Sequence, residues 1–326
     1  MSGPVSMSDT RTSTIPAGTS AGERRGRTRR AAGPARPKRI RSRQLATALL
    51  YLSPALLAIV FLRLAPAVSA VVASFQESGL TGGSGWAGLE NYRFLFGDPG
   101  FVNTIVVTVL FNLVVNPATV VLSLGLALLL SQRLPAAGLW RALVFAPAAV
   151  PVAVSGVIWS VVYQPDGLAN GLLTALGLPE QPFLTSAGQA PPSVMVTVLW
   201  VAVGYWMIFL IAGLQDIPRT YYEAAQIDGA SAWQRFRYVT LPLLRRPLAF
   251  VLVANTVGNF LIFAPIQILT NGGPEGATNL IMYDIYQQAY RIGDVNLAQA
   301  EVVLLMLVML VVVGVQFRLL GSKEGR

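Results

Sequence analysis

The sequence predicts an all-α membrane protein with six transmembrane helices, both termini in the cytoplasm, and a cytoplasmic helix between the fourth and fifth spans. Three observations carry this prediction. Of the 326 residues, 54% are hydrophobic and only 12% are charged, and the apolar residues gather in six long runs. A typical soluble domain has roughly 25% charged residues, so this chain has about half of the charge that a solvated globular surface uses.

The first predicted element is a basic tail, residues 1–44. Residues 1–43 hold eleven Lys and Arg residues but only two acids, Asp9 and Glu23, which accounts for the whole net charge of +9. The tail has no apolar periodicity and cannot bury enough surface to offset its ordering entropy, so we expect it to be disordered.

Three functional interpretations of this tail compete with that of a solvated cytoplasmic segment. A twin-arginine export signal is disfavoured because the apolar run that follows is much longer than the roughly 7–15 residues of a signal core. Nucleic-acid binding is disfavoured because residues 1–43 contain no aromatic residue. Contact with anionic lipids is compatible with a polybasic segment beside a membrane span and stays open.

Six runs are apolar and long enough to cross a bilayer, which takes roughly 20 residues of helix. They are residues 45–74, 102–130, 142–164, 194–213, 247–269 and 299–319. We expect them to form one domain, 45–320, followed by a short cytoplasmic end, 321–326. Prolines within the runs each remove a helix hydrogen bond and predict kinks; they are Pro54, Pro66, Pro117, Pro147, Pro151 and Pro265.

The distribution of Lys and Arg predicts the orientation, because cytoplasmic loops of membrane proteins carry the excess of basic residues. With the N-terminus inside, the inside segments hold 21 Lys and Arg residues, and the outside segments hold only Arg93 and Arg291. One further cation, Arg63, lies within the first run. Both termini are therefore expected in the cytoplasm.

Composition disfavours several classes of protein. The chain has no Cys and no His, so it alone supplies no thiol nucleophile, Cys/His zinc site or imidazole triad, and we predict neither a catalytic residue nor a metal site. No acid lies inside the six runs, with Glu301 at the outer edge of the last, which disfavours a membrane-embedded enzyme and an ion-coupled carrier. Residues 83–88 match G-x-G-x-x-G but open no strand–helix unit, so a dinucleotide site is disfavoured.

The segment 214–246 is the most informative inside loop. Pro218 suits a first helical turn, and helix formers run from there to Gly229, which permits a sharp reversal. Ser231, with Gln234 three residues later, predicts a capping box for a second short helix that ends near Pro242. From the residues alone, an ordinary amphipathic loop lying on the headgroups stays an alternative.

Within this loop, the pattern Glu223-Ala224-Ala225-x3-Gly229-x9-Val239-x-Leu241-Pro242 resembles the EAA loop of binding-protein-dependent ABC importers, with Val in place of Ile. Two further stretches resemble the carbohydrate-uptake branch of that family. They are Gly88-Leu89-Glu90-Asn91-Tyr92 and Leu269-Thr270-Asn271-Gly272-Gly273-Pro274. The resemblance extends over about residues 45–320 and leaves only the tail uncovered.

The resemblance implies a permease subunit of an ATP-driven sugar importer in a bacterial cell membrane. Its implied partners are a second permease subunit, two ATPase subunits, an extracytoplasmic solute-binding protein, the sugar and the lipid bilayer, and no nucleic acid. In that family the EAA loop seats on the ATPase. By carry-over, Glu223, Ala224, Ala225 and Gly229 form the coupling contact, and Asp228, Leu241 and Pro242 shape it.

The chain itself points to a separate ATPase. A P-loop needs Gly-Lys-Ser/Thr, whereas the two lysines of this chain, Lys38 and Lys323, follow Pro37 and Ser322. We therefore expect no cofactor on this chain, with ATP and Mg on the partner ATPase.

Candidate sugar-binding residues lie in the fourth and fifth runs. Asn255 and Asn259 are four residues apart and so share a helix face, and Trp200 and Tyr205 offer aromatic rings. By the resemblance, these positions line the substrate site of maltose-type permeases; interhelical hydrogen bonding and ordinary packing stay alternatives. A neutral sugar is preferred to a sugar phosphate or glycerophosphate, because Arg63 is the one cation within the runs apart from Arg318 at the cytoplasmic end of the last.

Overall fold

The computed structural model describes residues 42–79, 85–132 and 134–320. The tail 1–41 and the end 321–326 lie outside the described residues, so the expected disorder of the tail stays a prediction. Within the described ranges the protein is all-helical, and its one β-type pairing is an isolated bridge between Gln76 and Trp86. Four helices are long and apolar enough to cross a membrane, or five if one bent pair counts as a single span.

The chain divides into two compact units, residues 1–57 and 58–326. The described part of the first unit is most of helix α1 (Ser42–Ile59), which continues over the boundary. Pro54 lies inside α1 without ending it.

The second unit contains the remaining helices. Four of its short elements are not α-helical: three are π-helical turns (η1, Val60–Leu64; η3, Phe236–Thr240; η4, Gln287–Ile292), and η2 (Ala146–Ala149) is a 3-10 turn. In chain order, its elements are η1 (Val60–Leu64), α2 (Ala65–Ala73), α3 (Glu90–Gly97), α4 (Pro99–Leu130), α5 (Ala137–Phe145), η2 (Ala146–Ala149), α6 (Val152–Val162), α7 (Leu168–Ala175), α8 (Ala190–Gln215), α9 (Arg219–Ile227), α10 (Ala232–Arg235), η3 (Phe236–Thr240), α11 (Leu241–Leu243), α12 (Arg245–Phe260), α13 (Ala264–Leu269), α14 (Ile281–Tyr286), η4 (Gln287–Ile292) and α15 (Val295–Leu320).

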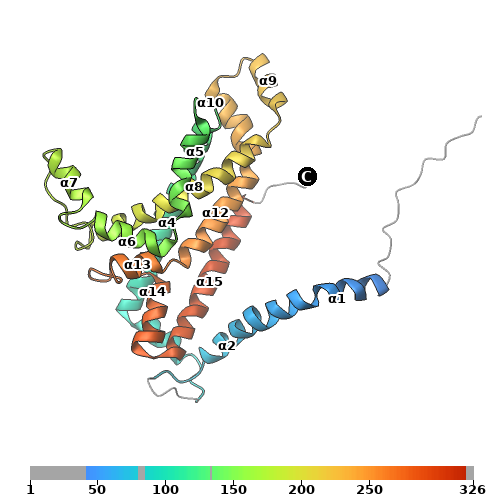
Figure 1. Ribbon diagram of the computed structural model, residues 1–326. Coiled ribbons are helices and arrows are strands. Elements are labelled where there is room, and N and C mark those ends of the chain that lie inside the picture. Colours follow the sequence, from blue (N-terminus) through green and yellow to red (C-terminus); the bar gives the residue numbers. More distant parts are fainter. Residues whose placement is uncertain (1–41, 80–84, 133, 321–326) are drawn as a thin grey trace, which may run out of the picture. The chain divides into compact units, whose positions relative to one another are not determined.

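Helices α4, α8 and α12 form the centre of the second unit. Helix α4 contacts α8 along much of its length and also contacts α12, and α12 contacts α15 (Figure 1). Their contact buries Met207, Leu210, Leu244 and Val251 completely. At Gly204 of α8, a methyl group would collide with the backbone carbonyl of Val144, so glycine permits the close approach of the C-terminal end of α5.

The third predicted run is a bent pair of helices. The segments Ala137–Ala149 and Val152–Val162 meet at an angle of 97°. A residue that precedes proline is driven out of the helical region, and Val150, which precedes Pro151, has an extended conformation with ψ of 130°. The bend therefore lies where the sequence places Pro151.

The fifth predicted run, 247–269, is interrupted. Helix α12 ends at Phe260 after 16 residues, and α13 begins at Ala264, after three intervening residues. A proline ring collides with the carbonyl four residues earlier, so Pro265 prevents the helix from continuing past Leu261. This run does not form one continuous spanning helix.

The last helix begins earlier than predicted, and this corrects the placement of one acid. Helix α15 begins at Val295, so Glu301 lies inside an apolar helix and not at its outer edge. Its side chain is completely buried, and neither carboxylate oxygen has a hydrogen-bond partner among the described residues.

Candidate functional site

The predicted inside loop is a helical hairpin whose turn depends on Gly229. The amide of Gly229 donates to the carbonyl of Gln226 at 3.0 Å, and the amide of Ala230 donates to that of Ala225 at 2.9 Å. This pair of hydrogen bonds is a Schellman motif, which needs a left-handed residue after the helix. Gly229 supplies it, with φ of +74°.

The second arm begins with the predicted capping box. The backbone amide of Ser231 donates to Oε1 of Gln234 at 2.7 Å, and the amide of Gln234 donates to Oγ of Ser231 at 3.3 Å. The π-helical turn η3 follows, in which the amide of Leu241 donates to the carbonyl of Phe236. Pro242 has no amide hydrogen, so the wider turn occurs directly before a residue that cannot donate to the helix.

The hairpin is largely exposed. No residue of α9 is buried, and Glu223, Ala224, Asp228 and Gly229 are all exposed, whereas Ala225 is half-buried. Apolar side chains are exposed beside them, since Ile227 is 87% and Trp233 69% exposed. A hollow of about 220 Å³ lies between the two arms, lined by Ala225, Asp228, Gly229, Ala230, Gln234, Arg235, Tyr238 and Val239.

The base of the hairpin is tied to the central helices. The hydroxyl groups of Tyr222 and Thr240 lie 3.0 Å apart and form a hydrogen bond between α9 and η3. Ile217 and Leu244, which flank the hairpin, are buried in the same core as Met207 of α8. The base of the hairpin is therefore packed against α8 and α12.

The two candidate asparagines meet at a third. Oδ1 of Asn116 in α4 accepts from Nδ2 of Asn255 at 2.8 Å and from Nδ2 of Asn259 at 2.7 Å. Nε1 of Trp206 donates to Oδ1 of Asn255 at 2.9 Å. The four-residue spacing thus places both amides on one face of α12, where they bond α4 to α12 and, through Trp206, to α8.

A cavity of about 400 Å³ lies beside Asn259. Asn259, Ser155 and Thr197 supply its polar groups and Phe263 an aromatic ring; the full lining is Val152, Ser155, Thr197, Val198, Val201, Ala202, Gly258, Asn259, Leu261, Ile262, Phe263, Ala264 and Pro265. None of these residues is charged. The cavity includes the break between α12 and α13.

The structure does not bring the two candidate aromatic residues to this cavity. Trp200 contacts Trp159 edge to face, with ring centroids 5.8 Å apart. Tyr205 is exposed and lies against Trp206 and Phe209. Asn255 does not line the cavity either, so Asn259 is the one candidate among the four that does.

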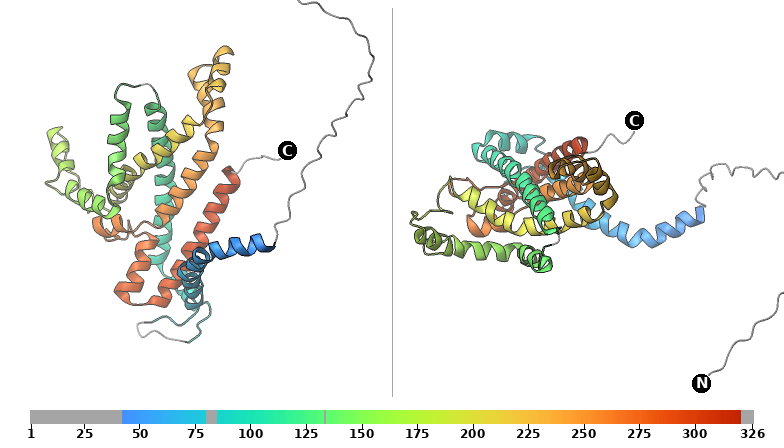
Figure 2. Two further views of the ribbon diagram at one scale, coloured as in Figure 1. Left: turned by 45° about the vertical axis from the view of Figure 1, so that its right-hand side comes forward. Right: turned by 90° about the horizontal axis from the view of Figure 1, so that it is seen from above.

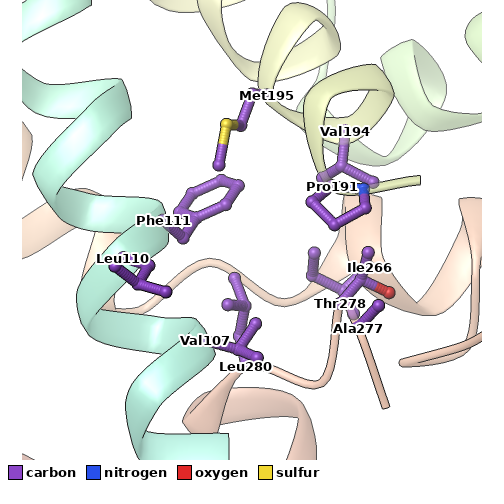
Figure 3. Close-up of a pocket in the computed structure, with 10 residues that line it drawn as sticks. All are labelled: Val107, Leu110, Phe111, Pro191, Val194, Met195, Ile266, Ala277, Thr278 and Leu280. Atoms are coloured by element: carbon purple, nitrogen blue, oxygen red, sulfur yellow. The ribbon is translucent and has the colours of Figure 1, made fainter. Parts of the chain in front are cut away.

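A second cavity, of about 120 Å³, is almost wholly apolar (Figure 3). Thr278 is the one residue with a polar side chain among the ten that line it, the others being Val107, Leu110, Phe111, Pro191, Val194, Met195, Ile266, Ala277 and Leu280. A sugar needs several hydrogen-bond partners, so this cavity does not suit one.

Sequence reasoning missed the residues of the site that come from other helices. Asn116, Ser155 and Thr197 lie on α4, α6 and α8, far in sequence from Asn259. One signal was available, since Asn112 and Asn116 have the same four-residue spacing as the pair in α12. Among the described residues, no group of three His, Cys, Asp or Glu could hold a metal ion.

Comparison with known proteins gives concordant matches. Residues 119–323 match the family described as binding-protein-dependent transport system inner membrane component. The chain is 35% identical to the trehalose/maltose transport system permease protein MalF of Thermococcus litoralis, over 74% of this chain and 80% of that protein. It is 33% identical to the sn-glycerol-3-phosphate transport system permease protein UgpA of Agrobacterium fabrum, over 74% and 82%.

A solved structure shares the fold. A subunit of the bacterial alginate ABC transporter, in complex with an alginate pentasaccharide-bound periplasmic protein, superimposes with a TM-score of 0.74 at 22% sequence identity. The match covers 86% of this chain and 94% of that subunit. At this identity the likeness shows the fold.

Proposed function

The chain belongs to the family of inner membrane components of binding-protein-dependent transport systems, and from that premise we propose that it carries a neutral sugar or oligosaccharide across the membrane. It is a multi-pass permease subunit of an ABC importer and not an enzyme.

The proposed topology has six spans with both termini in the cytoplasm. The spans are α1 with α2, α4, the bent pair α5 with α6, α8, the broken pair α12 with α13, and α15. The 21-to-2 distribution of Lys and Arg supports this orientation, which places the hairpin 219–243 in the cytoplasm. The basic tail 1–44 and the end 321–326 then lie on the same side, outside the permease domain 45–320.

The proposed coupling contact is the exposed turn of that hairpin. Glu223, Ala224, Ala225 and Gly229 meet the partner ATPase, and Asp228, Leu241 and Pro242 maintain the shape of the turn. The observation that supports this contact is the combination of an exposed, small-residue turn with a base packed into α8 and α12. ATP and Mg bind on the ATPase, whose closure moves the turn and thereby changes access to the cavity.

The cavity at Asn259 is the proposed route of the substrate. Its uncharged lining is the observation that supports a neutral substrate. Ser155, Thr197 and Asn259 offer hydrogen bonds to hydroxyl groups, and Phe263 offers an apolar face of the kind that a sugar ring stacks on. Asn255 does not line the cavity, but it donates a hydrogen bond to Asn116, which also binds Asn259. Trp200 and Tyr205 belong to the proposed substrate-binding residues only if the helices rearrange during transport.

Import of a sugar phosphate or glycerophosphate is the second candidate. The chain is 33% identical to a glycerol-3-phosphate permease and 35% identical to the trehalose/maltose permease. These similar identities favour a phosphorylated substrate as the alternative. Against it, no lining residue of the cavity is positively charged, whereas phosphate sites use Arg or Lys.

The proposed complex contains a second permease subunit, two ATPase subunits and an extracytoplasmic solute-binding protein. The alginate transporter, solved with its periplasmic protein, supports the last of these. Uptake of radiolabelled neutral oligosaccharides and of glycerol 3-phosphate by vesicles that contain the whole complex tests the proposal. Uptake of the phosphate alone would overturn the neutral substrate, and uptake that does not need ATP would overturn the coupling.

A further inference from the structure

A network of side-chain amides joins α4, α8 and α12 at the centre of the second unit. Its members are all buried: Asn112, Asn116, Trp206, Asn255 and Asn259. The three helices contact one another and lie side by side in Figure 2. An asparagine amide that turns by half a rotation exchanges a donor for an acceptor at the same place. The direction of the bonds in this amide network therefore decides which atom of its last member is free.

One end of the amide network is a group that can only accept. Nδ2 of Asn112 donates to the backbone carbonyl of Thr108 at 2.9 Å, so Oδ1 of Asn112 is turned toward Asn116. Nδ2 of Asn116 donates to that oxygen at 3.1 Å. Asn116 therefore directs its own oxygen at α12, where it accepts from both Asn255 and Asn259.

The other end is a group that can only donate. The indole N–H of tryptophan has no acceptor function, and Nε1 of Trp206 donates to Oδ1 of Asn255 at 2.9 Å. Nδ2 of Asn255 must then face Asn116, to which it donates at 2.8 Å. In a reversed network, two oxygens would face each other at Thr108 and two N–H groups at Trp206. Both ends therefore impose the same direction.

Asn259 is the open branch of the amide network. Its Nδ2 donates to Oδ1 of Asn116 at 2.7 Å. Its Oδ1 accepts no hydrogen bond from the described residues, yet it does not belong to their enclosed atoms that lack a partner. Since Asn259 lines the uncharged cavity, this oxygen is the atom that opens onto it.

We propose that Asn259 presents its amide oxygen to the transported solute, and that Asn116 is the positioning residue that fixes this orientation. The solute group that meets Asn259 must then be a hydrogen-bond donor, as a sugar hydroxyl is. An ether, carboxylate or ionised phosphate oxygen cannot donate and is repelled at this point. The assignment rests on the proposed function, since it takes the cavity at Asn259 as the place of the solute.

Replacement of single hydroxyl groups on the solute tests the direction of this bond. The whole complex, with its ATPase and binding protein, is reconstituted in vesicles. Uptake is measured for maltose, or for whichever neutral oligosaccharide these vesicles take up, and for derivatives with one hydroxyl at a time replaced by hydrogen or by fluorine. Fluorine accepts weakly and cannot donate. The binding protein is the same in every assay, so its own selectivity cancels when the permease variants are compared.

At one hydroxyl of the sugar, we expect both the deoxy and the fluoro derivative to be taken up at least about fivefold more slowly than the parent sugar. Asn259→Leu should abolish this penalty for both derivatives. Asn255→Leu is the matched control, because it also removes one bond to Asn116 but does not line the cavity. Whatever its effect on the absolute rate, it should keep both penalties.

Asn116→Leu tests the positioning role and gives an independent result if Asn259→Leu does not assemble. The amide of Asn259 is then free to turn and donate to fluorine, so the fluoro penalty should fall roughly fivefold while the deoxy penalty stays. A merely structural role of Asn116 would slow all three sugars alike and would overturn that assignment.

Two further results would refute the proposed orientation. If Asn259→Leu lowers the deoxy penalty alone, the second hydrogen of Nδ2 meets the solute in place of Oδ1. If the penalties are equal in the parent chain and in Asn259→Leu, no hydroxyl meets this residue. Uptake of glycerol 3-phosphate in place of neutral sugars would overturn the neutral substrate. Its deoxy and fluoro derivatives at carbon 2 then serve in the same test, so the two proposals fail separately.

Discussion

Oδ1 of Asn116 lies 2.7 Å from Nδ2 of Asn259, although 143 residues separate them in the sequence. The same oxygen accepts from Asn255, so one acceptor joins two turns of α12 to α4. A buried polar group that loses its partner costs about 1–3 kcal/mol. This relationship makes Asn116 the residue on which the two candidate asparagines depend.

Replacement of Asn116 by leucine should destabilise the protein by about 2 kcal/mol, because it leaves two buried amide groups without an acceptor. Thermal unfolding of the purified complex in detergent measures the effect. The control is Asn103→Ala, which removes a single exposed hydrogen bond to the carbonyl of Gly276. If both variants unfold at the same temperature, Asn116 does not hold these helices together.

Replacement of Gly229 should uncouple ATP hydrolysis from transport. A valine at φ of +74° is strained by about 1–3 kcal/mol, and it also adds bulk to the exposed turn. Asparagine tolerates this conformation, so Gly229→Asn adds bulk with little strain. We expect both variants to lose most of the substrate-stimulated ATPase activity of the reconstituted complex. Normal activity in Gly229→Asn would show that the turn needs its conformation and makes no close contact.

Replacement of Thr197 by valine should weaken transport with little effect on stability, because the two side chains have the same shape. If the hydroxyl bonds to substrate in the cavity, its loss costs about 1 kcal/mol, or roughly fivefold in the KM for uptake. Thr119→Val is the matched control. Thr119 also donates to a carbonyl of its own helix and is buried, but it does not line the cavity. An equal change in both variants would exclude a substrate contact at Thr197.

Asp284 should make stability depend on pH. Its pKa is raised above the ordinary value of 3.8, chiefly because burial disfavours the charged form, although a hydrogen bond from Asn279 opposes the shift. A carboxyl with a raised pKa in the folded state stabilises least at high pH, since the folded protein must then hold a buried charge. Asp284→Asn should therefore gain stability relative to the parent chain as the pH rises from 4 to 8. Thermal unfolding at each pH measures the effect. A difference in stability between the variant and the parent chain that stays constant from pH 4 to 8 would contradict this prediction.

Glu301→Gln should leave the complex at least as stable as the parent chain. The carboxyl group of Glu301 is completely buried without a hydrogen-bond partner among the described residues, so replacement by an amide of the same shape breaks no hydrogen bond and removes a group whose charged form is costly to bury. The exposed Glu223→Gln provides the comparison. A clear loss of thermal stability in Glu301→Gln alone would reveal a partner for the carboxyl group in the assembled complex.

Local signals in the sequence predicted the hairpin well. The capping box of Ser231 and Gln234 and the reversal at Gly229 depend on residues within a few positions of one another, and the structure confirms both. Proline was less informative. Pro117 lies inside the continuous helix α4, whereas Pro151 and Pro265 coincide with breaks, so the residue type alone does not tell which run is interrupted.

The candidate site was only partly predictable. The spacing of Asn255 and Asn259 indicated a shared helix face, but their partner Asn116 lies more than one hundred residues earlier, and packing decides that pairing. Packing also places Trp200 against Trp159 and Tyr205 at the surface, away from the cavity. The spacing of residues within one helix shows which side chains share a face of that helix. It does not show which other helix that face packs against.

The buried face of α4 has a consequence for the synthesis of the protein. Six of its polar residues are buried along this helix, namely Thr104, Thr108, Asn112, Asn116, Thr119 and Ser123. Ser123 finds its bond at the carbonyl of Val203, 80 residues later, and Asn116 finds its donors later still. Thr108, Asn112 and Thr119 bond within α4 itself, but while the ribosome is still making α8 and α12 a lipid environment would leave the hydroxyl of Ser123 and Oδ1 of Asn116 without these partners. Helix α4 therefore has reason to stay beside the insertion machinery until its partners emerge, and to enter the bilayer together with them.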